Sequence, residues 1–262
     1  MQIAGYIAAF FIGISLGLIG GGGSILTVPV LVYLFGISPI LATSYSLFVV
    51  GSTSLIGSLN SWRKGLIDFH TAFHFGMSSI VTVFITRKII IPHIPENIII
   101  GNVTLHFSIL TMLLFALLMI SASVSMIRSK LIQDHHPQSK KNIAELVLYG
   151  LSIGLVTGFL GAGGGFLLIP ALVLLLHLPM KKAIGTSLLI IALNSLAGFI
   201  GDEGHFQINW AFLSGISVIA IIGVFVGGCL HKSIDSEKLK KGFGWFILVM
   251  GIYIITREIW FR

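Results

Sequence analysis

The segment Gly20-Gly21-Gly22-Gly23-Ser24-Ile25-Leu26-Thr27-Val28-Pro29 returns later in the chain as Gly161-Ala162-Gly163-Gly164-Gly165-Phe166-Leu167-Leu168-Ile169-Pro170. Pro170 stands 141 positions after Pro29, and the two segments align without a gap. An internal repeat that covers more than half of a hydrophobic chain is typical of transporters built from two related halves. Seventeen residues of the first half have an identical residue 141 positions later, namely Gly13, Gly17, Gly20, Gly22, Gly23, Leu26, Pro29, Leu31, Val32, Leu34, Ala42, Ser46, Leu47, Ser54, Leu55, Gly57 and Ile67.

The composition is that of an integral membrane protein. Of 262 residues, 55% are hydrophobic and 10% are charged, whereas a soluble domain has roughly 25% charged residues. The single cysteine, Cys229, excludes a disulfide framework. The formal net charge is +7, but the excess lysines and arginines lie mostly in short loops beside apolar segments. There they set the orientation in the bilayer and do not indicate binding to nucleic acid.

Hydropathy predicts an all-α fold of about eight spans plus two broken or re-entrant half-helices. A span needs ~20 apolar residues at 1.5 Å per residue. The pieces Ile25–Phe35 and Phe166–His177 are too short for this, and irregular backbone survives at membrane depth only where it is buried in protein or lines a cavity. The number of full crossings between Ile3 and Leu59 is one or three. The expected spans are Ile3–Ile19, Ile40–Leu59, Phe69–Thr86, Leu105–Met126, Ala144–Leu160, Ala183–Ile200, Ile208–Leu230 and Phe243–Ile255.

Charge predicts how the halves lie in the membrane. We expect a first repeat over residues 1–127, a cytoplasmic linker over 128–143, and a second repeat over 144–262, because lysine and arginine favour the cytoplasm. Counting outward, Arg63-Lys64 falls inside, the acidic loop at Asp202 falls outside, and both termini fall outside. Each half then crosses an odd number of times, which makes the repeats inverted. Arg87-Lys88, placed outside, is the one exception.

The glycine runs predict substrate contacts at the two breaks. Glycines permit close backbone approach, and the free N–H groups at a helix start favour an anion. The alternative is that these glycines only let helices pack. The predicted substrate-binding residues of the two breaks are Gly22, Gly23, Ser24, Gly163, Gly164 and Gly165.

A second matched element follows each break. Ser46, Thr186, Ser187 and Asn194 place hydroxyl and amide groups inside apolar helices, where they can hydrogen-bond a polar substrate. Serine and threonine can instead bond the carbonyl one turn back in their own helix. Lys181 and Lys182 come just before this element in the second half. They either orient the chain or form a basic entrance for anions.

His70 and His74 are four residues apart on one helix face, the spacing of two metal ligands or of a proton-coupling pair. A metal-ion or cation carrier that uses them is an alternative function, and a non-transporting membrane scaffold is another. Catalysis has little support, because the chain has no paired membrane carboxylates, no His-Glu-x-x-His and no P-loop. We therefore expect neither an enzyme nor a cofactor.

The second break and the following Ala183-Ile184-Gly185-Thr186-Ser187 resemble the sulfite exporter TauE/SafE family of membrane permeases. The resemblance covers nearly the whole chain. It implies a secondary transporter of about eight spans that moves sulfite, organosulfonates or related sulfur-containing anions across a bacterial inner membrane. The first half departs from the family motif, since Ser44-Tyr45-Ser46 stands where Gly-Thr-Ser is expected, so the second half is expected to dominate the site.

The resulting prediction is a permease that works by alternating access and binds its anion at the glycine breaks. A fixed lysine or arginine at the site is not obvious from the sequence, and its absence would suit a substrate that must also be released. The expected partners are the small anion and the lipid bilayer, without nucleic acid. Coupled protons and a homodimer remain open.

Overall fold

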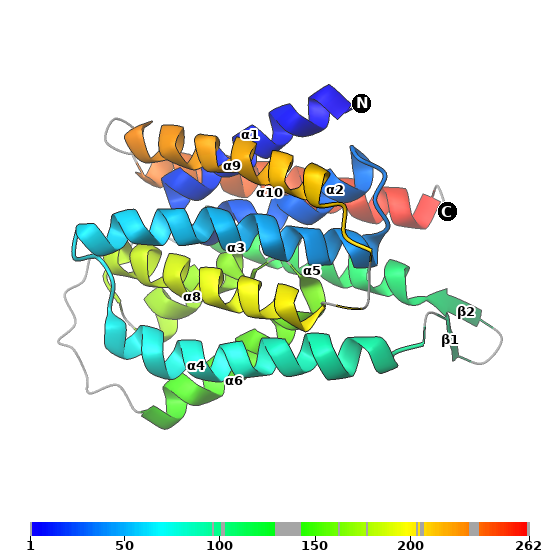
Figure 1. Cartoon of the computed structure of the whole chain (residues 1–262), viewed down its shortest axis with the longest axis horizontal. Coiled ribbons are helices and arrows are strands. Elements are labelled where there is room, and N and C mark those ends of the chain that lie inside the picture. Colours follow the sequence, from blue (N-terminus) through cyan, green and yellow to red (C-terminus); the bar gives the residue numbers. More distant parts are fainter. Residues whose placement is uncertain are drawn as a thin grey trace.

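The computed structural model describes residues 2–95, 97–100, 103–128, 143–161, 163–176, 178–202, 204, 207–230 and 236–260. This part of the chain contains eight helices of 17 residues or more. In Figure 1 these helices run along the long axis of the bundle, and both termini lie at the same end. The fold is the predicted all-α membrane bundle. The helices are α1 (Gln2–Ile19), α3 (Pro39–Arg63), α4 (Phe69–Ile85), α5 (Phe107–Arg128), α6 (Ile143–Leu160), α8 (Met180–Gly201), α9 (Trp210–Leu230) and α10 (Ser236–Trp260).

The two short pieces are broken helices, as predicted. In the first half a 3-10 helix, η1 (Gly21–Leu26), passes directly into α2 (Thr27–Tyr33). In the second half α7 (Gly165–Pro170) passes into a π-helical turn, η4 (Ala171–Leu175). The segments η1 and α7 pack against each other inside the bundle.

The span that begins at Phe69 is longer than predicted. After α4 the chain continues through a π-helical turn, η2 (Thr86–Ile90), and a 3-10 turn, η3 (Ile91–His93), so that one apolar helical stretch covers Phe69–His93. The predicted end at Thr86 is therefore wrong, and the reason is that Arg87 was taken for a loop charge. A short antiparallel hairpin of β1 (Asn97–Ile100) and β2 (Val103–His106), which the sequence does not predict, leads into α5.

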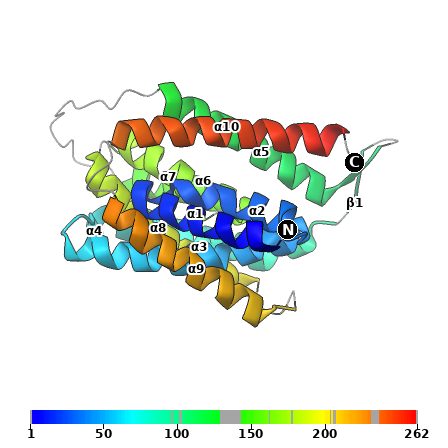
Figure 2. The ribbon, with the colours of Figure 1, turned by 90° about the horizontal axis from the view of Figure 1, so that it is seen from above.

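Equivalent helices of the two halves run in opposite directions. The helices α3 and α8 lie side by side in the middle of the bundle (Figure 1), with Gly51 against Leu196 and Gly57 against Leu188. The helices α5 and α10 also pack along each other (Figure 2), and Ser123 Oγ donates a hydrogen bond to the carbonyl of Gly244. Antiparallel packing of matched helices is the geometry of an inverted repeat.

The other helix contacts follow the same symmetry. Helix α1 packs on α9, and its counterpart α6 packs on α4; likewise α3 contacts α9 while α8 contacts α4. The first helix of each half, α1 or α6, thus packs on the fourth helix of the other half, α9 or α4. This arrangement interlocks the two repeats. The boundaries at 127 and 144 remain a prediction, because residues 129–142 of the linker lie outside the described part of the chain.

Two matched hydrogen bonds fix the starts of α4 and α9. The backbone N–H of Asp68 donates to Thr186 Oγ1 at 2.9 Å. At the offset of 141, the backbone N–H of Asn209 donates to Tyr45 Oη at 2.8 Å. Asp68 and Asn209 also cap their own helices through side-chain oxygens. The inverted symmetry therefore extends to individual polar contacts.

Polarity is arranged as in a protein surrounded by lipid. Large apolar side chains such as Phe11, Phe73 and Val249 are more than 60% exposed on the outside of the bundle. The interior instead holds buried serine, threonine and asparagine side chains, among them Ser46, Asn194 and Ser195. Among the described residues, five helices are long and apolar enough to cross a membrane by length and composition alone. The chain is a multi-pass membrane protein.

Glycines on α6 let it approach α4 closely. A β-carbon on Gly154 would lie 2.7 Å from the carbonyl oxygen of Ser79 and 3.0 Å from Thr82 Cβ. We predict that Gly154→Ala lowers the stability of the protein by about 1–3 kcal/mol through overpacking. The matched control is Gly215→Ala on α9, since Gly215 has nothing within 4 Å of such a β-carbon. Thermal unfolding in detergent measures both, and equal midpoints for the two variants would contradict the prediction.

Candidate functional site

The two glycine breaks have different backbones. In the second half Gly161, Gly163 and Gly164 have φ of 65°, 66° and 68°, a left-handed conformation that favours glycine. At the first break only Gly20, with φ of 79°, has such a conformation, and the following residues continue as η1. The second break is therefore the sharper interruption of the helix.

One face of α3 lines the second break. Thr43, Ser46, Val50 and Ser54 recur at helical spacing and so share this face. Two contacts show that this face of α3 points toward the second break. A β-carbon on Gly161 would overlap Thr43, and one on Gly163 would lie 2.7 Å from Val50 Cγ1. All four side chains are fully buried or nearly so.

A face of α8 lines the same break from the other side. A β-carbon on Gly163 would also lie 2.7 Å from Ser195 Oγ and 3.2 Å from Ile191 Cγ2. Ser187 and Asp202 share the face of Ile191 and Ser195 by helical spacing. The antiparallel pair α3 and α8 thus presents two small polar stripes to the second break.

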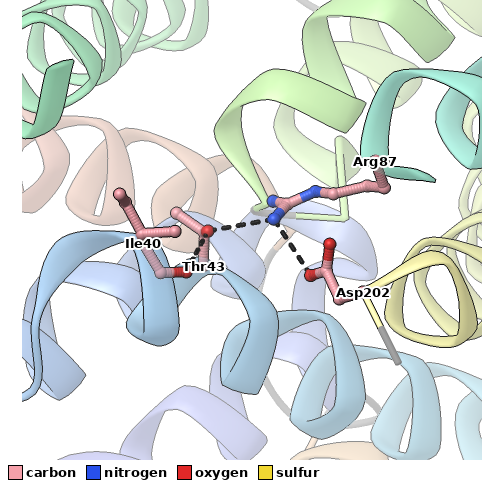
Figure 3. A network of polar contacts seen from close by, with 4 residues as sticks. All are labelled: Ile40, Thr43, Arg87 and Asp202. Carbon is pink, nitrogen blue, oxygen red and sulfur yellow. Dashed lines mark hydrogen bonds and ion pairs between the residues drawn. The ribbon is translucent and has the colours of Figure 1, made fainter. Parts of the chain in front are cut away.

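Arg87 brings a positive charge into this region. It lies in η2, is 1% exposed, and is the one buried lysine or arginine among the residues whose burial the structure describes. Its Nη1 donates to Asp202 Oδ2 and to Thr43 Oγ1, both at 3.1 Å. Figure 3 shows the guanidinium between Thr43 on α3 and Asp202 at the end of α8. A side chain at Gly161 would overlap Arg87 Nη2, so the break and the guanidinium are in contact.

The guanidinium leaves one edge without partners. Nε and Nη2 make no hydrogen bond to any residue that the structure describes. These two nitrogens form one fork of the planar group, and such a fork matches two oxygens of a carboxylate or similar oxyanion. Thr43 holds the opposite corner in place, because its hydroxyl donates to the carbonyl of Ile40 at 2.7 Å while it accepts from Arg87.

Other buried polar atoms in the same region are also without partners in the described part of the chain. These atoms are Oγ of Ser44, Ser46, Ser54 and Ser195, and Oδ1 of Asn194. The amide nitrogen of Asn194 does have a partner, since it donates to Ser79 Oγ at 2.7 Å. Buried polar groups are normally hydrogen-bonded, so unpaired ones on two adjacent helices indicate places for a polar ligand or for water.

The sequence of the chain matches one known family. A family model described as sulfite exporter TauE/SafE covers residues 6–254. The chain belongs to the TauE/SafE family. It is 29% identical over 253 residues to a probable membrane transporter protein of Xylella fastidiosa strain Temecula1, covering 94% of this chain and 92% of that one. It is 26% identical over 235 residues to the probable membrane transporter protein YdhB of Bacillus subtilis strain 168, covering 88% and 91%. No solved structure matches it.

Family membership and the names of these relatives identify this TauE/SafE protein as a membrane transporter. The relatives are named as transporters and not as enzymes. The names of these relatives give no substrate. The cargo of this TauE/SafE chain therefore has to be argued from its own residues.

Three predicted substrate residues of this TauE/SafE protein have partners inside the protein. Ser24 Oγ donates to the carbonyl of Gly21 at 2.7 Å, and Ser187 Oγ donates to the carbonyl of Ile184 at 2.9 Å. Thr186 accepts the N–H of Asp68. Ser24 and Ser187 thus follow the alternative given for hydroxyls in helices. Ser46 and Asn194 are the predicted side chains that keep an unpaired polar atom.

The predicted glycines are held tightly. A β-carbon would overlap Thr157 at Gly164 and the Gly21 backbone at Gly165, while at Gly23 it would lie 2.8 Å from the Ile12 carbonyl oxygen of α1. Gly22 lies within η1. Valine at these positions would disturb packing whatever the substrate, so such variants cannot report on an anion site.

Sequence reasoning did not single out Arg87, Asp202 and Thr43 of this TauE/SafE chain, which the structure brings together beside the second break. The signal was available for Arg87, because it was the one basic position that violated the charge rule. A charge that does not fit an outer loop and follows an apolar helix without a break is a candidate for burial. An intramembrane charge is a functional-site hypothesis by default.

The two remaining sequence candidates lie elsewhere. The rings of His70 and His74 are 4.5 Å apart, and His74 Nδ1 lies 3.0 Å from the carbonyl oxygen of His70. Within the described residues no group of three or more metal-ligating side chains occurs. Lys181 and Lys182 are exposed at the start of α8.

The buried pair makes a prediction about stability. Arg87→Gln leaves Asp202 as a buried charge without its cation, and such a break typically costs about 3–5 kcal/mol. The double variant Arg87→Gln/Asp202→Asn removes both charges, and we expect it to recover most of this loss. Thermal unfolding of both variants in detergent is the measurement. If the double variant were no more stable than the single one, the two side chains would not act as a pair.

Proposed function

We propose that this chain is a secondary transporter of small sulfur-containing anions such as sulfite or organosulfonates. It works by alternating access, and the anion binds at the second glycine break. The observation that carries the proposal is the buried Arg87 guanidinium, whose Nε and Nη2 lack partners among the described residues and which touches Gly161.

The charge and shape of this edge favour an oxyanion. A guanidinium fork offers two parallel N–H groups, and a sulfite or sulfonate group has oxygens that can accept both. A metal cation would find no ligand on this edge, because Nε and Nη2 carry only N–H donors. The unpaired hydroxyls of Ser46 and Ser195 add neutral donors on the two flanking helices.

Family membership supports sulfur chemistry, because the matching family is described by sulfite export. Arg87 alone does not separate a sulfonate from a carboxylate of similar size. The predicted glycine contacts of the first break, Gly22 and Gly23, become secondary in this proposal, since the charge lies at the second break. Gly163 is the predicted glycine closest to the polar stripes.

The energy source that we propose is an ion gradient or the gradient of the anion itself, since the sequence has no P-loop. We also propose that the protein lies in the bacterial inner membrane with residues 128–143 in the cytoplasm. Exposed basic residues gather at that end, among them Arg63, Lys64, Lys181 and Lys182. Arg87 no longer counts against this orientation, because its charge is buried and paired.

Flux of labelled sulfite, taurine, sulfoacetate and sulfate into proteoliposomes tests the proposal, with and without a pH gradient. The variant Arg87→Gln/Asp202→Asn removes the charge without leaving its partner unpaired. We expect it to lower the flux of the transported anion roughly ten- to hundredfold, because hydrogen bonds to a charged group are lost. Arg63→Gln, at an exposed arginine, is the control and should transport like the wild type.

The same assay separates the cation alternative. His70→Ala/His74→Ala should leave anion flux unchanged if the anion binds at Arg87. Divalent-metal flux that this histidine variant abolishes, together with no flux of any sulfur anion, would overturn the proposal. A dependence of anion flux on the pH gradient would identify protons as the coupled ion.

A further inference from the structure

Arg87, the cation that is proposed to bind the substrate, already has the carboxylate of Asp202 against it. We propose that Asp202 is an internal counter-ion, which neutralises Arg87 in the empty transporter and gives way when the transported anion binds. This inference rests on the proposed function and adds a role for a residue outside the predicted site. Asp202 is 3% exposed and Arg87 is 1% exposed, and the two side chains form an ion pair of 3.1 Å.

The contact between the two side chains is a single one. Asp202 Oδ2 accepts from Nη1 at 3.1 Å, and Thr43 shares the same nitrogen. The side-on fork of Nε and Nη2 remains without a partner in the described residues. A buried arginine with a purely structural role would be expected to have its donors satisfied. The two donors that would hold an oxyanion side by side are therefore unpaired among the described residues.

An anion at the fork would weaken the contact with Asp202. Two negative charges would then share one guanidinium in a region of low dielectric, where like charges repel strongly. The carboxylate can yield without unfolding α8. Its backbone N–H is anchored to the carbonyls of Gly198 and Phe199 at 3.2 and 3.1 Å, so rotation of the side chain leaves the end of α8 in place.

The device occurs once in the chain. At the offset of 141, Gly228 stands opposite Arg87, and Ser61 stands opposite Asp202. Ser61 Oγ donates to the carbonyl of Gly57 in its own helix and supplies no charge. The inverted symmetry therefore breaks at this pair, since the matched positions carry neither a cation nor a carboxylate.

A counter-ion of this kind has a specific consequence for the transport cycle. Net uptake requires the empty transporter to reorient, and Arg87 must be neutralised while it does so, because an uncompensated buried charge is strongly unfavourable. Exchange of anion for anion needs only the loaded form, in which the substrate itself neutralises Arg87. Removing the carboxylate should separate these two activities.

The experiment compares Asp202→Asn with the wild type in proteoliposomes, using whichever labelled anion among sulfite, taurine, sulfoacetate and sulfate the wild type moves. We expect net uptake to fall about tenfold or more, because the empty form carries an unneutralised cation. Counterflow should stay close to the wild-type rate. Asp202→Glu keeps a carboxylate and should restore net uptake at least in part.

Asp68→Asn is the matched control. It removes a carboxylate from a helix cap, and the equivalent position 209 already has an asparagine that caps α9 in the same way. Net uptake and counterflow of this variant should both match the wild type.

A binding measurement keeps the test independent of reorientation. In detergent, the same anion should bind Asp202→Asn about tenfold more tightly than the wild type, because its competitor is gone. Addition of the anion should also raise the unfolding temperature of Asp202→Asn more than that of the wild type. A variant that is merely damaged would show weaker binding and a smaller shift.

The outcomes separate the two proposals. If the wild type moves none of the anions, the proposed function fails and the counter-ion role falls with it. If the wild type transports, but Asp202→Asn loses net uptake and counterflow equally or binds the anion no more tightly, the function stands and the counter-ion role is overturned.

Discussion

The need to keep the charge of Arg87 inside an apolar bundle is the constraint on which the rest of this structure depends. A guanidinium at 1% exposure has to find an opposite charge and hydrogen-bond acceptors within the protein. The end of α8 supplies the charge through Asp202, and the first turns of α3 supply the acceptor through Thr43. The contact with Gly161 further requires that the second break has no side chain at this position. Three separate elements are thus placed by one side chain.

The architecture could be read from the sequence because it depends on features that are local or repeated. Apolar length sets the spans, and the offset of 141 sets the relation between the halves. Glycine runs set the breaks. The antiparallel packing of α3 on α8 then follows from an odd number of crossings in each half. The hairpin of β1 and β2 and the extension of α4 through η2 were not predicted, because a charged residue was taken as the end of a span.

The site was harder to predict, because its main contact joins residues 115 positions apart in the chain. Nothing in the local sequence of Arg87 or Asp202 indicates that they meet. The hydroxyls of Ser24 and Ser187 were predicted to bind substrate because of their chemistry. In the structure each donates a hydrogen bond to a carbonyl three residues back in the chain. Thr186 belongs to the family-like motif, yet its oxygen holds the start of α4. Chemistry at the right place in the sequence does not by itself distinguish a binding group from a structural one.

The contacts at the starts of α4 and α9 have a consequence for the balance between the two ends of the bundle. A threonine hydroxyl accepts one N–H at one end, and a tyrosine hydroxyl accepts the equivalent N–H at the other. If the repeats were identical, forms opened at either end would have the same free energy. Any preference for one form must therefore come from positions where the halves differ. A phenol in the place of a small aliphatic hydroxyl is such a difference, and in the proposed alternating-access cycle it would favour one of the two forms.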